Sequence, residues 1–237
     1  MVKLEVCVDD ALGLAEAVVG GADRVELCAA LALGGLTPSV GLMEQAARMP
    51  IPCYPIIRPR SGDFVFTAAD VAVMKADIRA ARALGLPGVV LGASRADGRL
   101  DAAVLSDLVA EAHGLDLTLH RAVDLCPDVE EAVETAIALG FRRILSSGGA
   151  KTASEGIDRL ALMMATAKGR LIIMPGSGVS LETLPALAVL PLSEVHASCA
   201  APLPIGGVPL AFGFQSLHDK RTDCATVAAL KAALKAL

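Results

Sequence analysis

The chain has 237 residues, enough for one large domain or two small ones, and 54% of them are apolar, which allows a sizeable core. Aromatic residues make up only 3% and Trp is absent, so this core must be aliphatic, as in a barrel of buried strands wrapped by helices. The net charge of −5 and the lack of a basic run argue against nucleic acid as a partner.

Short β-rich runs alternate with helical segments along the chain. The runs are KLEVCV from Lys3, RVELC from Arg24, PCYPIIR from Pro52, GVVLG from Gly88, DLTLHR from Asp116, RRILSS from Arg142, LIIMPG from Leu171 and EVHAS from Glu194. Between them, apolar residues recur at spacings of three and four, as in Val71, Met74, Ile78 and Ala81, and predict helices. The predicted helix N-caps are Ser39, Thr67, Asp101, Asp128 and Ser180.

This alternation predicts a parallel sheet, and eight such units in a chain of this length match a single (β/α)8 TIM barrel over residues 1–237. A doubly wound sheet is the alternative that periodicity does not exclude. The segment from Cys199 to Asp223 is irregular and follows the eighth strand, where barrels often build an active-site loop.

The chain begins directly with a strand-like run, without a positive segment or a long apolar run, so we expect no secretory signal. Prolines and glycines interrupt the uncharged stretch 195–217, so we expect no membrane span and no membrane partner. The six cysteines are scattered without a CxxC pair, which predicts reduced thiols and a cytoplasmic location.

Charged residues inside the predicted strands are the most informative feature. Parallel strands buried on both faces are normally apolar, and burial of a charge is costly unless the charge is paired or functional. Side-chain alternation predicts that Glu5, Glu26, Arg58, His120 and His196 point inward and ring one cavity at the C-terminal ends of the strands, where barrel active sites lie. The alternative is an ion pair of Glu5 or Glu26 with Arg58 that only fills the barrel.

Two glycine-rich turns follow late strands, Ser146–Gly149 after the sixth and Pro175–Gly178 after the seventh. Such turns direct backbone N–H groups at anions. Together with Arg58 and Arg60 they predict a small anionic ligand as a partner.

Two cysteines, Cys7 and Cys28, end adjacent predicted strands. Adjacent strands lie about 5 Å apart, and two thiolates can bind the soft ion Cu(I). Two packed core thiols are the alternative. No spacing indicates a structural zinc site or a catalytic Cys–His pair.

In eight motifs the sequence resembles the CutC family over nearly its whole length. The motifs are LEVCV (4–8), GADRVELC (21–28), GGLTPS (34–39), IIRPRSGDF (56–64), LHRAVD (119–124), ILSSG (144–148), MPGSGV (174–179) and EVHAS (194–198). The chain departs from the family pattern at Ser61, where Gly is common, and in a shorter, more Pro-rich 199–223 segment.

The resemblance implies a (β/α)8 barrel, a role in cytoplasmic copper homeostasis, and Cu(I) as a ligand of Cys7 and Cys28. By motif position it implies a pocket formed by Glu5, Glu26, Arg58, Arg60, His120, Arg121, Asp124, Ser147, Gly148, His196 and Ser198.

Three functional hypotheses remain at this point. The first is a copper-binding homeostasis protein. The second is an enzyme that uses Glu5, Glu26, His120 and His196 for acid–base chemistry on a small phosphorylated or carboxylated metabolite. Its ligand-binding residues would be Arg58, Arg60, Arg121, Asp124, Ser147, Gly148, Gly176, Gly178 and Ser198. The third is a non-catalytic oligomeric scaffold, and a homo-oligomer is left open in all three.

Overall fold

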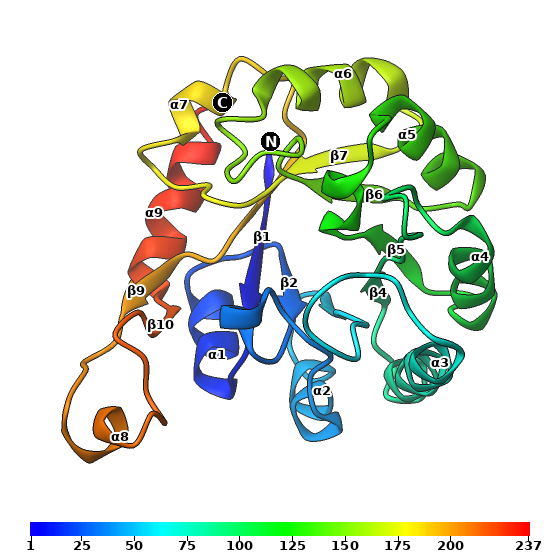
Figure 1. Cartoon of the computed structure of the whole chain (residues 1–237). Coiled ribbons are helices and arrows are strands. Elements are labelled where there is room, and N and C mark those ends of the chain that lie inside the picture. Colours follow the sequence, from blue (N-terminus) through cyan, green and yellow to red (C-terminus); the bar gives the residue numbers. More distant parts are fainter.

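Eight parallel strands form the centre of the molecule in the computed structural model, which describes residues 1–237 (Figure 1). They are β1 (Lys3–Val8), β2 (Arg24–Leu27), β3 (Cys53–Pro55), β4 (Gly88–Leu91), β5 (Asp116–Leu119), β6 (Arg143–Ser146), β7 (Ile172–Pro175) and β8 (Glu194–Ala197). Hydrogen bonds order them β3-β2-β1-β8 and β4-β5-β6-β7. A parallel bridge between Ile56 and Val90 joins β3 to β4, and β7 lies beside β8. This sequential order confirms the barrel and rules out the doubly wound alternative.

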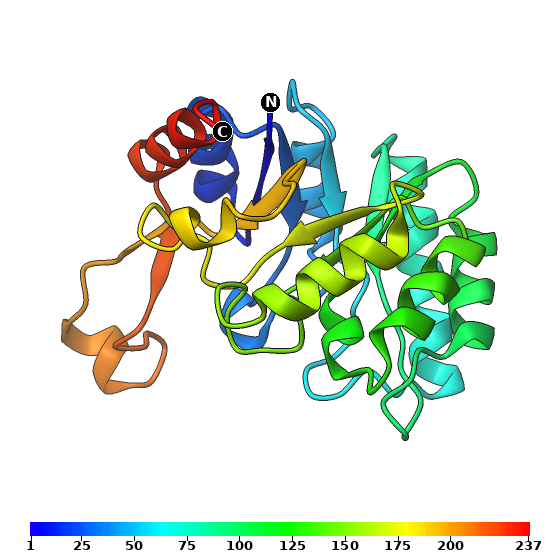
Figure 2. The same ribbon diagram turned by 90° about the horizontal axis from the view of Figure 1, so that it is seen from above.

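Helices follow the strands and surround the barrel (Figure 2). They are α1 (Ala11–Val19), α2 (Val40–Ala46), α3 (Ala68–Ala83), α4 (Ala102–Glu111), α5 (Val129–Ala138), α6 (Ile157–Ala167), α7 (Leu184–Leu187) and α9 (Cys224–Leu234). Four predicted caps are confirmed, because Ser39, Thr67, Asp101 and Asp128 each accept a backbone N–H in the first turn of α2, α3, α4 and α5. The prediction for Ser180 is wrong, because the N-cap of α7 is Thr183. None of the helices combines the length and apolarity needed to cross a bilayer.

The core lies between the strands and this ring of helices, and it is aliphatic as the composition predicts. Its largest fully buried side chains are Leu, Ile and Met, such as Leu27, Ile57 and Met74. Burial of each such side chain stabilises the fold by about 1.5–3 kcal/mol.

An arm projects from the barrel where the sequence predicts a mouth loop (Figures 1 and 2). It consists of the antiparallel strands β9 (Ala200–Pro202) and β10 (Lys220–Thr222), with α8 (Gly207–Ala211) at its far end. At its root, the Thr222 hydroxyl donates to the carbonyls of Cys7 and Ser198. No arm residue lines the cavity described below.

Candidate functional site

Charged and hydroxyl side chains form a network of ion pairs and hydrogen bonds at the N-terminal end of the barrel. Its members are Glu5, Arg24, Tyr54, Asp116, Thr118, Arg143 and Glu194. Arg24 donates to Glu5 and Glu194, and Arg143 donates to Glu194, Thr118 and Asp116 at 2.9–3.1 Å. Both guanidinium groups lie over the Tyr54 ring, 5.4 and 5.6 Å from its centroid. Every charge in this network has a partner of opposite sign, which is the condition for burying it.

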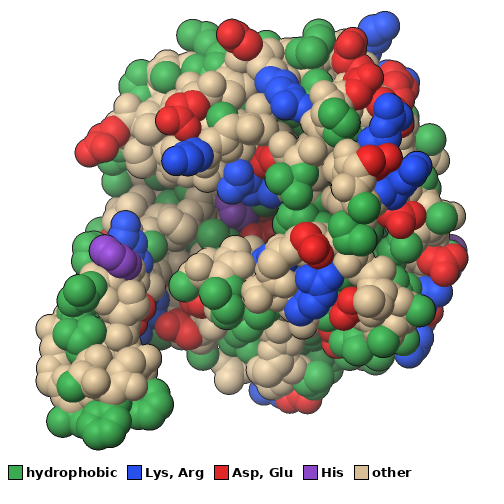
Figure 3. Space-filling view, in the orientation of Figure 1, with side chains coloured by type: hydrophobic (Ala, Val, Ile, Leu, Met, Phe, Trp, Pro, Cys, Tyr) green, Lys and Arg blue, Asp and Glu red, His purple; other side chains and the backbone are tan.

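A cavity of about 300 Å³ opens at the other, C-terminal end of the strands. Figure 3 shows the molecule hollowed near its centre, with His and basic side chains visible in the hollow. The polar residues that line the cavity are Cys7, Glu26, Arg58, His120, Arg121, Ser177, His196 and Ser198. This mouth is where the sequence places the working site.

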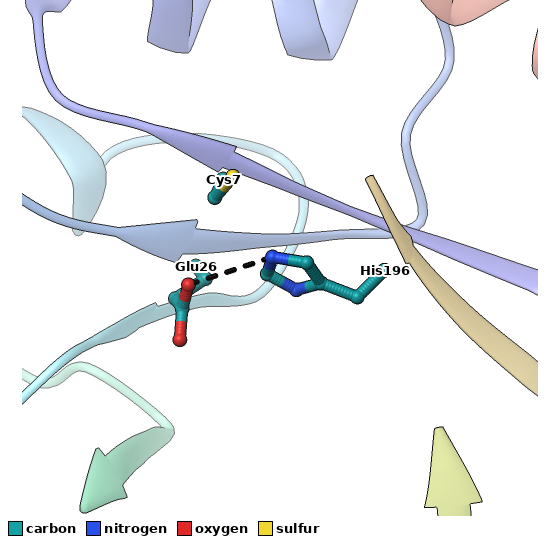
Figure 4. A group of neighbouring side chains, drawn as sticks. All are labelled: Cys7, Glu26 and His196. Carbon is teal, nitrogen blue, oxygen red and sulfur yellow. Dashed lines mark ion pairs between the residues drawn. The ribbon is translucent and has the colours of Figure 1, made fainter. Parts of the chain in front are cut away.

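Three side chains on the cavity wall gather from neighbouring strands: Cys7 of β1, Glu26 of β2 and His196 of β8 (Figure 4). Their ligand atoms all lie within 4.8 Å of one another, and His196 Nε2 is 3.7 Å from a Glu26 carboxylate oxygen. All three are buried. A thiol, an imidazole and a carboxylate in this arrangement can share a proton or ligate one metal ion.

Glu5 fixes the orientation of the His196 ring, because its carboxylate lies 2.8 Å from Nδ1. Burial alone would raise the pKa of Glu5, but Arg24 and then His196 outweigh it and lower that pKa to about 2. Arg24 and His196 contact the Glu5 carboxylate, and Glu5 does not line the cavity, so the geometry favours a positioning role over the expected role as a general acid or base. With Nδ1 held by Glu5, His196 presents Nε2 to Cys7 and Glu26.

Glu26 and His196 titrate differently from Glu5. Burial raises the pKa of Glu26 above its ordinary value, even though His196 lies beside it. Burial opposes the charged form of His196, but Cys7 and the two glutamates outweigh it and raise the pKa of His196 well above its usual value. Two carboxyl groups around one imidazole thus have pKa values shifted in opposite directions, an arrangement that separates a proton carrier from a fixed charge.

Cys28 lies behind Glu26 rather than on the cavity wall. Its thiol donates to a Glu26 oxygen at 3.6 Å, and it shares a small apolar cluster with Cys7, Tyr54 and Ile56. Burial, followed by the charge of Glu26, raises the pKa of Cys28 well above its usual value. The Cys7–Cys28 pair remains a prediction, and the structure adds Glu26 and His196 as neighbours of Cys7.

His120 follows β5 and caps the short helix η2 (Arg121–Leu125). Its Nδ1 accepts the Ala122 N–H at 3.2 Å, so the proton of the neutral ring lies on Nε2. Burial, and then the charge of Arg58, lower the pKa of His120 to about 3. Nε2 is buried and has no partner. His120 is therefore suited to donate a hydrogen bond, rather than to act as the general acid or base that we expected.

The alternative of an ion pair between Arg58 and Glu5 or Glu26 is ruled out. Arg58 donates only to backbone carbonyls, those of Leu33, Gly35 and Gly62, at 2.9–3.0 Å. It ties the loop after β2 to the loop after β3, and its Nε has no partner. Its sequence neighbour Arg60 lies outside the cavity and pairs with Asp63 and Asp70.

The turn after β6 does not offer its amides to an anion. The Asp124 carboxylate already accepts the N–H groups of Ser147 and Gly149, the Ser146 hydroxyl and the Arg121 guanidinium. The Gly148 N–H donates to the Ser146 hydroxyl, and a Cβ at Gly148 would lie 2.2 Å from a backbone oxygen. Asp124, Ser147 and Gly148 therefore shape the loops behind the site, which corrects their expected role in direct ligand binding.

The turn after β7 has free amides. Ser177 and Gly178 adopt left-handed backbone conformations, with φ of 75° and 72°. The N–H groups of Ser177, Gly178 and Val179 have no acceptor among the hydrogen bonds of the structure, and all three residues line the cavity. Gly176 lies beneath them, where a Cβ would meet the side chains of Leu145 and His196.

Sequence reasoning missed two features of the interior. The network of Arg24, Arg143 and Glu194 could have been found, because these are further charges at the starts of predicted strands. The contact of Cys7 with His196 has no signal in sequence spacing. It arises because barrel closure places β1 beside β8, and their register pairs Glu5 with His196.

Comparison with known proteins agrees with the resemblance found in the motifs. Residues 2–201 match the CutC family. A CutC family protein from Sinorhizobium medicae is 57% identical over 100% of this chain and 97% of its own length. Another from Caulobacter vibrioides is 52% identical, over 100% of this chain and 98% of its own length.

Solved structures give the same result. One named for the copper homeostasis protein CutC of Streptococcus agalactiae is 30% identical, with a TM-score of 0.79, and covers 84% of this chain and 99% of that one. Phosphoribosylanthranilate isomerase from Thermotoga maritima shares the fold alone, at 13% identity and a TM-score of 0.59 over 100% of both chains. The chain belongs to the CutC family.

Proposed function

We propose that this protein serves copper homeostasis in the cytoplasm by binding one Cu(I) ion in the barrel mouth, through Cys7 Sγ and His196 Nε2 with Glu26 beside them. The observation that carries the proposal is the position of these three ligand atoms within 4.8 Å of one another. Thiolate and imidazole are ligands suited to copper. All six cysteines are unpaired, which supports a reducing compartment.

The surroundings of His196 also favour a metal ligand. Metal-bound histidines usually donate their second ring N–H to a carboxylate, which fixes the ring and strengthens the ligand. Glu5 takes this position at Nδ1 and is itself held by Arg24. A carboxylate oxygen of Glu26 lies 3.7 Å from Nε2 and adds a third ligand atom beside the thiol and the imidazole.

Competition for Cu(I) with a chelator tests this proposal. We expect Cys7→Ser and His196→Gln each to lower the affinity at least about tenfold. Cys224→Ser, which alters a half-buried thiol at the start of α9, is the matched control and should bind as wild type does. Cys28→Ser tests the predicted cysteine pair: a loss as large as in Cys7→Ser makes Cys28 a ligand. Wild-type affinity in Cys7→Ser would contradict the proposal.

The opposite pKa shifts of Glu5 and Glu26 around His196 favour a second candidate, an enzyme that moves a proton on a small anionic metabolite. Glu26 would carry the proton and His196 would relay it, in an isomerisation or epimerisation. Incubation with sugar phosphates and carboxylates in D₂O should then place deuterium at one substrate carbon. His196→Gln should abolish the exchange, and a lack of exchange with every compound would count against this function.

A further inference from the structure

Arg58 is a buried cation without a counter-ion. Its side chain lines the cavity and only 5% of the residue is exposed, yet no carboxylate lies within ion-pair distance. Three carbonyl oxygens satisfy its terminal nitrogens, while Nε has no partner. An uncompensated buried charge is costly, and the protein pairs its other interior guanidinium groups, Arg24 and Arg143, with carboxylates. The missing negative charge is what a ligand in the cavity would supply.

His120 adds a hydrogen-bond donor to the same wall. Its Nδ1 is occupied by the Ala122 N–H, so Nε2 carries a proton that has no acceptor. The Phe64 ring packs against His120 with 4.8 Å between centroids, and it also lies 5.0 Å from the Arg58 guanidinium. Gly92 makes room for the imidazole, because a Cβ there would come within 2.4 Å of the ring. The ring is therefore held in place with its donor unused.

A third group of donors lies on the turn after β7. The free N–H groups of Ser177, Gly178 and Val179 are consecutive, and the left-handed conformations of the first two residues form the kind of backbone concavity that binds anions. These residues line the same cavity as Arg58 and His120. Arg58 Nε, His120 Nε2 and three consecutive amides thus offer donors that have no protein acceptor.

The negative groups of the mouth lie elsewhere. Glu26 belongs to the cluster with Cys7 and His196, while Asp124 is outside the cavity and bound to Arg121. An acid group in the cavity would therefore be attracted to the Arg58 and His120 wall, where no carboxylate occupies the donors. The rest of the ligand would then face Cys7, Glu26 and His196.

We infer that the barrel mouth contains a binding subsite for a small oxyanion, the carboxylate or phosphate group of an anionic ligand, built from Arg58, the His120 Nε2–H and the amides of Ser177, Gly178 and Val179. The subsite shares a cavity with the proposed Cu(I) site but none of its residues. In the enzymatic alternative, on which this part of the inference rests, it would hold the acid group of the substrate beside His196.

Titration of the metal-free wild-type protein with inorganic phosphate, and separately with acetate, tests the inference. Two-dimensional NMR should show saturable shifts of the Ser177, Gly178 and Val179 amides and of the His120 Nε2–H. The anion that binds more tightly identifies the acid group. If neither anion shifts these signals at millimolar concentrations, the inference is overturned, and no variant has to fold for that result.

Variants then assign the donors. His120→Phe keeps a ring beside Phe64 but removes Nε2–H, and Arg58→Lys keeps the charge but removes Nε. Each should raise the dissociation constant of the bound anion about tenfold, as expected for the loss of a hydrogen bond to a charged group. Arg60→Lys is the matched control, because Arg60 is two residues away and outside the cavity. These variants leave the net charge near neutral pH unaltered, so wild-type anion affinity in both His120→Phe and Arg58→Lys would indicate nonspecific attraction and would overturn the inference.

The two proposals fail independently. Cys7→Ser should abolish Cu(I) binding and leave the phosphate or acetate affinity unchanged. His120→Phe should weaken the binding of phosphate or acetate and leave the Cu(I) affinity unchanged. Loss of anion binding in Cys7→Ser would show that the anion sits on the cysteine cluster, and would overturn the assigned subsite.

Discussion

The two ends of the barrel contain the same kinds of residue in different states. At the N-terminal end, Arg24 and Arg143 are saturated by Glu5, Glu194 and Asp116. At the C-terminal end, Arg58 has no carboxylate, and buried nitrogens of Arg58 and His120 have no partner at all. The difference teaches that a buried charge alone does not mark a site. What marks the mouth as functional is the set of donors that the protein itself leaves unused.

The largest effect is expected from breaking the saturated end. Arg24→Met leaves the buried carboxylates of Glu5 and Glu194 without their shared cation, and should lower the free energy of unfolding by about 3–5 kcal/mol. Urea denaturation would measure the loss. Arg99→Met, which removes an exposed pair with Glu131, is the control and should cost less than about 1 kcal/mol. Similar losses in both variants would contradict the distinction between a paired interior network and a surface pair.

The two ends of the barrel should lose stability in different pH ranges as the solution is acidified. The pKa of His120 is lowered from 6.5 to about 3, so the unfolded chain takes up its proton first and stability falls as the pH drops from 6.5 toward 3. The pKa of Glu5 is lowered from 4.5 to about 2, so its contribution is present above 4.5 and is lost between 4.5 and 2. The pKa of Glu26 is raised, so its effect on stability has the opposite sign: its protonation at low pH favours the folded state.

The difference between wild type and His120→Phe therefore isolates the histidine. Between pH 6.5 and 4.5, wild type should lose up to about 1.4 kcal/mol of unfolding free energy per pH unit relative to the variant. Below pH 4.5 both proteins should share the loss that comes from Glu5. Denaturation curves at a series of pH values measure this, and parallel pH profiles above pH 4.5 would show that His120 is not held neutral.

The smallest effect concerns a third unpartnered group. The Ser94 hydroxyl, after β4, is buried without a hydrogen bond. Because Ser94→Ala removes a buried polar group that has no partner, it should leave stability unchanged or raise it by about 1 kcal/mol. Thr118→Ala is the matched change at the saturated end, where the hydroxyl accepts from Arg143, and it should be destabilising. A loss in Ser94→Ala as large as in Thr118→Ala would mean that Ser94 has a partner after all.

Much of the fold follows from local patterns. Eight β-rich runs, the helix caps and the aliphatic composition predict the barrel, because each depends on residues close in sequence. Side-chain alternation also predicts correctly that Glu26, Arg58, His120 and His196 face the mouth. It fails for Glu5, which lies one layer deeper, because alternation gives the direction of a side chain but not the depth of its strand in the barrel.

The pairing of these groups was decided only by the tertiary structure. In the sequence, Arg58 is as available to Glu5 as Arg24 is, and nothing in spacing shows that Asp124 fills the turn after β6 while the turn after β7 stays free. The sequence by itself determined which residue types enter the barrel. Strand register and barrel closure decided which of them meet, since ion pairs and hydrogen bonds depend on distances of a few ångströms between residues far apart in the chain.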